Sequence, residues 1–110
     1  MAHAYIDAIS EAGADAVKFQ THLSEFESSR HEEFRIKVFP QDKTRSDYWD
    51  RTSFTLDQWS ILKKHCDDKN IIFLSSPFSV EAVKLLRKIG TSAWKVASGE
   101  TNNQLLLEEI

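Results

Sequence analysis

Apolar and polar positions along this chain of 110 residues follow a repeating order in which helix-like runs precede short apolar runs. Gly13 stands before "ADAVKFQ", Asn70 before "IIFLSS" and Gly90 before "TSAWKVAS". Glycine and asparagine tolerate the left-handed backbone that commonly ends a helix. The pattern therefore predicts three strands, each preceded by a helix.

Helix starts are also legible in the sequence. Thr55 with Gln58 and Thr101 with Gln104 each have the spacing of a capping box, and Ser79 is placed to cap the run that follows it. These signals predict four helices, at about residues 2–12, 56–69, 80–89 and 102–110.

Apolar residues in the predicted helices recur with helical spacing, so each helix has one face that must be covered. In the second helix this face contains Leu56, Trp59, Leu62 and Cys66, and in the third it contains Val80, Val83 and Leu86. The strands are short and mostly apolar, which is typical of parallel strands covered by helices. We therefore expect an α/β fold with a parallel sheet.

Residues 22–54 interrupt this order with a long polar and charged segment that also contains several aromatic residues. A connection of this length in a compact domain is either functional or disordered, and α/β folds carry active-site loops after strand ends. The aromatic residues favour partial order, including a short helix around Glu32 to Lys37. A variable surface excursion is the alternative interpretation.

Two lysines lie inside apolar strands. Alternation places Lys18 and Gln20 on the face opposite Phe19, and it places Lys95 opposite Trp94. An unpaired ammonium group is costly to bury, so these positions would be unfavourable in a sheet covered on both faces. In a barrel, the inward side of each strand leads to a polar mouth where lysines can meet an anionic substrate.

Hydroxyl groups lie at the same end of the middle strand. Ser75 and Ser76 precede a predicted helix start, where hydroxyls and backbone N–H groups suit phosphate oxygens. Spacing alone leaves other interpretations open, because a lysine near a strand end can extend to water. Likewise, Glu100 can be a catalytic carboxylate or a favourable charge beside a helix start.

Composition excludes several classes of protein. A net charge of −3 gives no basic surface for nucleic acid or an anionic membrane. Cys66 is the single cysteine, and the sequence has no signal-peptide core or long apolar run, so we expect a cytoplasmic protein. The histidines His3, His22, His31 and His65 have no convincing ligand spacing, so no metal site is predicted.

Three motifs, "EAGADAVKFQT" (11–21), "FLSSPFS" (73–79) and "WKVASGETNN" (94–103), resemble in order and spacing the first part of the sialic acid synthase family. This family includes N-acetylneuraminate synthases, legionaminate and pseudaminate synthases and spore-coat polysaccharide proteins. The resemblance implies part of a TIM (β/α)8 barrel, with parallel strands alternating with helices. It also implies an enzyme that condenses phosphoenolpyruvate with an N-acetylmannosamine-type sugar, giving a nonulosonic (2-keto) acid and phosphate.

The resemblance assigns roles residue by residue. Lys18 matches the motif lysine near the phosphoenolpyruvate site, and Lys95 begins the segment expected to contact carboxylate or phosphate. Glu100 matches the acidic residue that binds sugar or handles a proton. Ser76 stands where the family has threonine, and its hydroxyl can still bond to phosphate. The predicted site comprises the catalytic candidates Lys18, Lys95 and Glu100 and the substrate-binding candidates Gln20, Ser75, Ser76, Ser98, Gly99 and Asn102.

The same resemblance implies that residues 1–110 are part of a larger synthase domain, with residues 22–54 as a long βα loop. The first strand, the later strands and a C-terminal antifreeze-like domain would lie outside this chain, as would the ligands of a divalent Mn or Mg ion. We expect a homodimer at full length and no activity from residues 1–110 alone. Two alternatives remain: a barrel aldolase with Lys95 as Schiff-base nucleophile, and a non-catalytic anion-binding or structural fragment.

Overall fold

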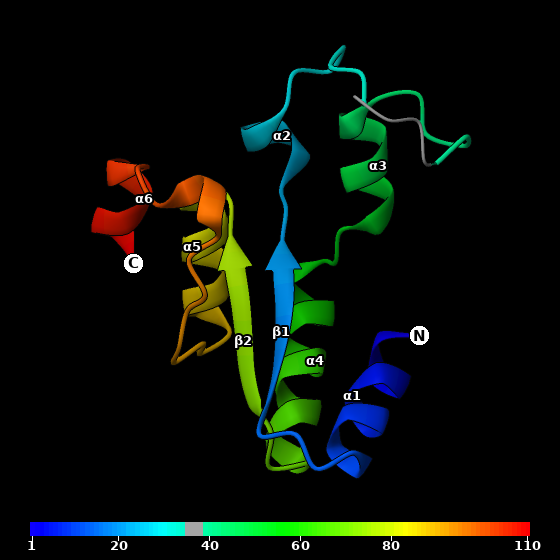
Figure 1. The fold of residues 1–110 in the computed structure, drawn as a ribbon, viewed down its shortest axis with the longest axis vertical. Coiled ribbons are helices and arrows are strands. Elements are labelled where there is room, and N and C mark those ends of the chain that lie inside the picture. The colour runs from blue at the N-terminus through cyan, green and yellow to red at the C-terminus, as the bar shows by residue number, and fades with distance from the viewer. Residues whose placement is uncertain (35–38) are drawn as a thin grey trace.

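Two parallel strands form the centre of the computed structural model, which describes residues 1–34 and 39–110. Strand β1 (Ala16–Thr21) pairs with β2 (Ile72–Pro77), with Ala16 opposite Ile72 and Thr21 opposite Pro77. Both strands run in the same direction and end side by side (Figure 1). The predicted parallel α/β arrangement is confirmed.

The four predicted helices are present, with slightly different ends. They are α1 (Ala2–Glu11), α4 (Leu56–Asp68), α5 (Val80–Lys88) and α6 (Gln104–Glu109). The three predicted helix stops are confirmed, because Gly13, Asn70 and Gly90 have φ angles of 77°, 56° and 80°. In the part of the chain that the structure describes, no helix is long and apolar enough to cross a membrane.

The long segment after β1 contains helices, but not where the sequence indicated. Helix α2 (Ser24–Glu27) and helix α3 (Arg45–Thr52) lie beyond the end of β1 (Figure 1). The helix expected around Glu32 to Lys37 is wrong for residues 32–34, which are irregular, and residues 35–38 lie outside the described residues. Helix α3 was not predicted, because it has no buried residue and therefore lacks an apolar face, although Thr44 and Asp47 form a capping box at its start.

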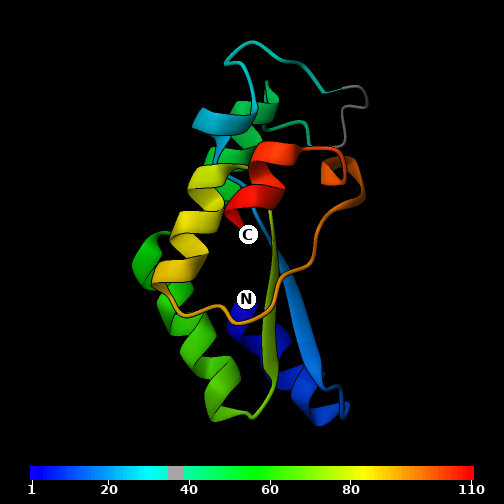
Figure 2. The same ribbon diagram turned by 90° about the vertical axis from the view of Figure 1, so that its left-hand side faces the viewer.

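The third strand is much shorter than predicted. After α5, the chain pairs with β2 only through an isolated parallel bridge between Ser75 and Trp94, beside which the Lys95 N–H donates to the Ser75 carbonyl at 3.2 Å. The Thr91 N–H closes the end of α5 on the Leu86 carbonyl, and a 3-10 helix, η1, already begins at Ser98. These two turns leave only a few residues around Trp94 that can pair with β2. Figure 2 shows this segment running beside the strands before it reaches η1 (Ser98–Glu100) and α6.

Aromatic and aliphatic side chains fill the space between the strands and the helices. Phe19 packs edge-on against Trp59 at 5.7 Å and stacks on Phe73 at 5.3 Å between ring centroids. Leu56, expected on the buried face of α4, is 41% exposed because it occupies the first position of the helix. The buried core comprises Ile6, Val17, Trp59, Leu62, Cys66, Ile71, Phe73 and Leu86.

Side-chain caps fix the helix starts. The Thr55 hydroxyl accepts the Gln58 N–H at 3.2 Å, and the Gln58 side chain accepts the Thr55 N–H at 2.9 Å, so this capping box is confirmed. The Ser79 hydroxyl accepts the Ala82 N–H at 3.2 Å, which confirms the second cap.

The capping box predicted at Thr101 is wrong. The Thr101 hydroxyl donates to the Ser98 carbonyl at 3.1 Å, and Asn103 instead caps α6 by accepting the Leu106 N–H at 3.2 Å. The cap moves two residues along because Thr101 closes the 3-10 turn that precedes α6.

Replacing Thr55 with alanine removes a cap, whereas the same change at Thr101 does not. We expect Thr55→Ala to lower the free energy of unfolding by about 1 kcal/mol. Thr101→Ala is the matched control, and we expect it to cost less than about half as much because it removes only an exposed bond to a turn carbonyl. Urea denaturation of both variants measures the difference; equal losses would contradict the cap assignment.

The thiol of Cys66 is fully buried in the core. Burial, with the nearby Asp67 carboxylate, raises its pKa to about 11. Only the thiolate reacts with alkylating reagents, so at pH 8 ionisation alone should slow modification of the native thiol roughly two-hundredfold relative to an unfolded thiol. Mass spectrometry after iodoacetamide treatment, with and without denaturant, tests this. Similar rates in both conditions would show that Cys66 is accessible in the native protein.

Candidate active site

The carboxyl ends of β1 and β2 form a rim where most of the predicted site residues gather. Helices α2, α3 and α6 and the turn η1 lie at this end of the strands, while the opposite end carries the connections from α1 and α4 (Figures 1 and 2). In (β/α)8 barrels this end of the sheet carries the functional groups.

Strand register places three polar side chains in one row across the rim. Gln20 is directly opposite Ser76, and the bridge between Ser75 and Trp94 brings Lys95 to the same level on the other side of Ser76. Lys18 lies two residues before Gln20 on β1, and its side chain is on the same face. Adjacent strands are about 4.8 Å apart, so the row spans roughly 10 Å. Both lysine side chains and Gln20 are exposed and can reach a ligand above the row.

Ser76 is the one member of this row that is buried. Its side chain is 1% exposed, and its Oγ has no hydrogen-bond partner among the described residues. Buried polar groups are nearly always hydrogen-bonded. The polar row therefore contains one unpaired buried hydroxyl, between Gln20 and Lys95.

Ser75 is placed differently. Its hydroxyl is on the helix-covered face, where it shares a 2.8 Å hydrogen bond with the Thr21 hydroxyl, and both side chains are 0% exposed. The structure does not bring Ser75 together with Lys18. Its hydroxyl instead ties β1 to β2 inside the core.

The remaining predicted residues lie in and after η1. Ser98, Gly99 and Asn102 are exposed, whereas Glu100 is half-buried. The Glu100 carboxylate accepts a hydrogen bond of 2.8 Å from the Asn103 side-chain amide, and the other end of that amide caps α6. Asn103 thus fixes the carboxylate relative to a helix, a role that the sequence pattern did not assign to it.

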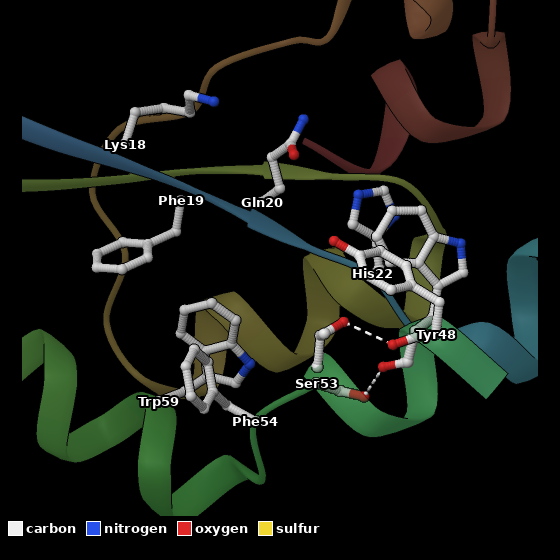
Figure 3. Close-up of a pocket in the computed structure, with 10 residues that line it drawn as sticks. Lys18, Phe19, Gln20, His22, Tyr48, Ser53, Phe54 and Trp59 are labelled. Carbon is white, nitrogen blue, oxygen red and sulfur yellow. Dashed lines mark hydrogen bonds between the residues drawn. The ribbon is translucent and has the colours of Figure 1, made fainter. Parts of the chain in front are cut away.

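A cavity of about 330 Å³ opens beside Lys18 and Gln20 (Figure 3). The segment 22–54 supplies most of its remaining wall, so this segment belongs to the site. The lining residues from that segment are His22, Tyr48, Trp49, Thr52, Ser53 and Phe54. Two of their hydroxyls are already engaged within α3 and its end: Thr52 donates to the Tyr48 carbonyl at 2.8 Å and Ser53 to the Trp49 carbonyl at 2.6 Å.

Sequence reasoning missed His22, which follows β1 directly. Its ring stacks on Trp49 at 3.7 Å and on Phe78 at 4.0 Å between centroids, and its Nδ1 lies 2.6 Å from a Glu27 carboxylate oxygen. Alternation from Lys18 and Gln20 indicates the face of this position, but the contacts with Trp49 and Phe78 join distant segments and have no signal in the sequence.

An ion pair and a hydrogen bond between side chains hold α2 and α3 in place. Arg51 on α3 donates two hydrogen bonds to Asp42, with lengths of 2.8 and 2.6 Å. These bonds from Arg51 hold the pKa of the Asp42 carboxyl below its usual value. Ser24 at the start of α2 also donates to Asp50 on α3, which joins the two helices over the rim.

The resemblance implies a divalent metal whose ligands lie outside residues 1–110. Over residues 1–34 and 39–110, no group of three or more histidine, cysteine or acidic side chains could hold an ion. His3 and His65 contact each other between α1 and α4, with Asp7 beside them, away from the rim.

Alternating helices and parallel strands, with a polar rim at the strand ends, define this chain as part of a (β/α)8 barrel. The chain belongs to the NeuB family, whose profile matches residues 5–110. This result confirms the resemblance carried by the three sequence motifs.

Relatives with assigned names support the same family. The N,N'-diacetyllegionaminic acid synthase of Campylobacter jejuni is 29% identical over 113 residues, which cover 100% of this chain and 34% of that protein. The human N-acetylneuraminate-9-phosphate synthase is 31% identical over 107 residues, covering 90% of this chain and 28% of that protein. The spore coat polysaccharide biosynthesis protein SpsE of Bacillus subtilis is 36% identical, covering 99% and 29%.

A solved structure has the same fold. The N-acetylneuraminic acid (sialic acid) synthetase of Leptospira borgpetersenii, in complex with citrate, matches with a TM-score of 0.77 and 30% identity. The match covers 98% of this chain and 34% of that one. The chain thus spans about a third of the length of these relatives.

Proposed function

We propose that this chain is part of a nonulosonic acid synthase, which condenses phosphoenolpyruvate with an N-acylated, mannosamine-type amino sugar and releases phosphate. The observation that carries this proposal is the buried, unpaired hydroxyl of Ser76, in a row between Gln20 and Lys95 and close to Lys18. An acceptor-rich anion supplies the partner that this hydroxyl lacks.

The charge of the row suits phosphoenolpyruvate. This substrate carries a carboxylate and a phosphate, and two ammonium groups can form short charge-assisted hydrogen bonds to them. Lys95 stands at one end of the row beside Ser76, and Lys18 lies two residues before Gln20 on the same face of β1. Groups fixed in this way also stabilise the charge that collects on phosphate as it leaves.

The reaction joins the methylene carbon of phosphoenolpyruvate to the carbonyl carbon of the open-chain sugar. Water supplies the oxygen of the new keto group, and phosphate leaves, so the atoms balance. In this scheme the Glu100 carboxyl group, held by Asn103, donates a proton to the aldehyde oxygen of the sugar as the C–C bond forms, and it regains a proton from the water that adds to the former enol carbon. Its half-buried position gives it the fixed geometry that proton transfer requires.

The names of the relatives agree with this proposal. They include synthases of legionaminic, pseudaminic and sialic acids, which differ in their sugar but share a class of product. The Leptospira synthetase was solved in complex with citrate, a polycarboxylate anion. The Schiff-base alternative predicts that borohydride traps a keto substrate on Lys95, whereas the proposed reaction forms no covalent bond to this lysine.

Phosphate release tests the proposal directly. A synthase of full family length that contains this chain should release phosphate from phosphoenolpyruvate when N-acetylmannosamine and Mn²⁺ are present. We expect Lys95→Ala to reduce kcat/KM at least about tenfold, because it removes a charge-assisted hydrogen bond. Lys84→Ala, which removes an exposed lysine from α5, is the control. No release with any N-acylated hexosamine would exclude the synthase assignment.

Ser76→Ala separates a ligand-binding hydroxyl from a structural one. We expect the KM for phosphoenolpyruvate to rise about tenfold, while the free energy of unfolding stays equal or increases, because an unpaired buried hydroxyl is removed.

Thr91→Val is the matched control, because the Thr91 hydroxyl is also buried and unpaired among the described residues but lies after α5, away from the rim. It should leave this KM unchanged. Steady-state kinetics and thermal unfolding of both variants provide the measurements. An unchanged KM in Ser76→Ala would show that Ser76 does not contact the substrate.

A further inference from the structure

The imidazole of His22 is held between two aromatic rings at the edge of the cavity. The plane of the His22 ring lies at 11° to the plane of the Trp49 ring and at 18° to that of the Phe78 ring, so the three rings form a nearly parallel stack. Trp49 belongs to α3, and Phe78 follows β2 directly. The side chain of His22 is only 13% exposed, so its ring has little freedom to turn.

Glu27 fixes the remaining freedom of this ring. The Nδ1 atom of His22 donates to one carboxylate oxygen of Glu27 at 2.6 Å, and the other oxygen accepts the Leu23 N–H at 2.7 Å. The Glu27 side chain is 8% exposed, and both of its oxygens are in use. A carboxylate bonded to Nδ1 in this way sets the orientation of the ring and the tautomer of a neutral imidazole.

The second ring nitrogen is left for another partner. Among the described residues, Nε2 of His22 forms no hydrogen bond, and His22 lines the same cavity as Lys18 and Gln20. Figure 3 shows a ring nitrogen of His22 on the side toward the Gln20 amide. Two rings and a buried carboxylate thus hold a hydrogen-bonding atom at the cavity, although no part of the described chain uses it.

We propose that His22 is a positioning and specificity residue whose Nε2 hydrogen-bonds a hydroxyl group of the acceptor sugar. This inference rests on the proposed function, and it assigns the sugar to the side of the cavity formed by residues 22–54. The rings of Tyr48 and Phe54 provide apolar surface there for the C–H groups of a sugar.

A sugar hydroxyl fits this position better than the anion does. The pair of His22 and Glu27 carries no net charge when both groups are ionised, and a net negative charge when the imidazole is neutral. It therefore offers no net attraction to a phosphate or carboxylate. A hydroxyl both donates and accepts, so it can bond Nε2 whether or not that nitrogen carries a proton.

Two substitutions distinguish the two ring nitrogens. In His22→Asn, the shorter amide reaches about as far as Nδ1, so it can still donate to Glu27 but nothing remains at the Nε2 position. In His22→Gln, the longer amide reaches about as far as Nε2 and can restore the bond to the sugar. The pair is matched because both variants are uncharged amides and both remove the stacked ring.

Steady-state kinetics of the full-length synthase give the decisive comparison. We expect His22→Asn to raise the KM for N-acetylmannosamine about tenfold while the KM for phosphoenolpyruvate changes less than about twofold. His22→Gln should recover most of the loss, to within about threefold of the unchanged protein. Equal losses in both variants, or a rise confined to the KM for phosphoenolpyruvate, would overturn the proposal.

Direct binding keeps this inference separate from the proposed synthase activity. If the unchanged protein releases no phosphate, the synthase proposal has failed, and ¹H–¹⁵N spectra of the imidazole groups then test His22 alone. We expect N-acetylmannosamine to shift the Nε2 signal of His22 while Nδ1 stays bonded to Glu27, and phosphoenolpyruvate to leave Nε2 unchanged. The same spectra decide the question if His22→Asn does not fold. No shift with the sugar overturns the proposal.

Discussion

The parallel pairing of β1 with β2 is the constraint on which the rest of the structure depends. Its register places Gln20 beside Ser76, and the bridge from Ser75 to Trp94 extends the same row to Lys95. A shift of one residue would turn every side chain of a strand to the other face. The polar row would then enter the aromatic core, so the packing of that core fixes the geometry of the site.

The hydroxyl pair of Thr21 and Ser75 shows how closely core and rim are joined. These two groups satisfy each other at 2.8 Å within the helix-covered face, while Ser76, the next residue, remains unpaired on the opposite face. Adjacent serines with the same side chain therefore have different roles. The hydroxyl of Ser75 contributes to stability through a buried hydrogen bond, whereas the hydroxyl of Ser76 has no partner among the described residues.

Local signals in the sequence were sufficient to predict most of the helices and their boundaries. Left-handed positions such as Asn70 and caps such as Thr55 predicted helix boundaries to within two residues, because these effects depend only on neighbouring residues. The cap at Thr101 and the long third strand were wrong, because a 3-10 turn after the Trp94 bridge took up the residues concerned. Alternation identified the face of Lys18. It could not reveal the role of His22, which depends on contacts between distant segments.

These distant contacts divide the rim into two chemically different halves. Lys18, Lys95 and Ser76 offer positive charge and a hydroxyl, which suit an anion. The aromatic stack around His22, fixed by Glu27, offers apolar faces and one oriented nitrogen, which suit a neutral polyol. The proposed condensation of an anion with a sugar requires both surfaces next to each other, because bringing two reactants together supplies much of a catalytic effect. In that proposal, His22 and the cavity-lining residues of 48–54 are as important to the site as the strands, although they lie outside the regular α/β order.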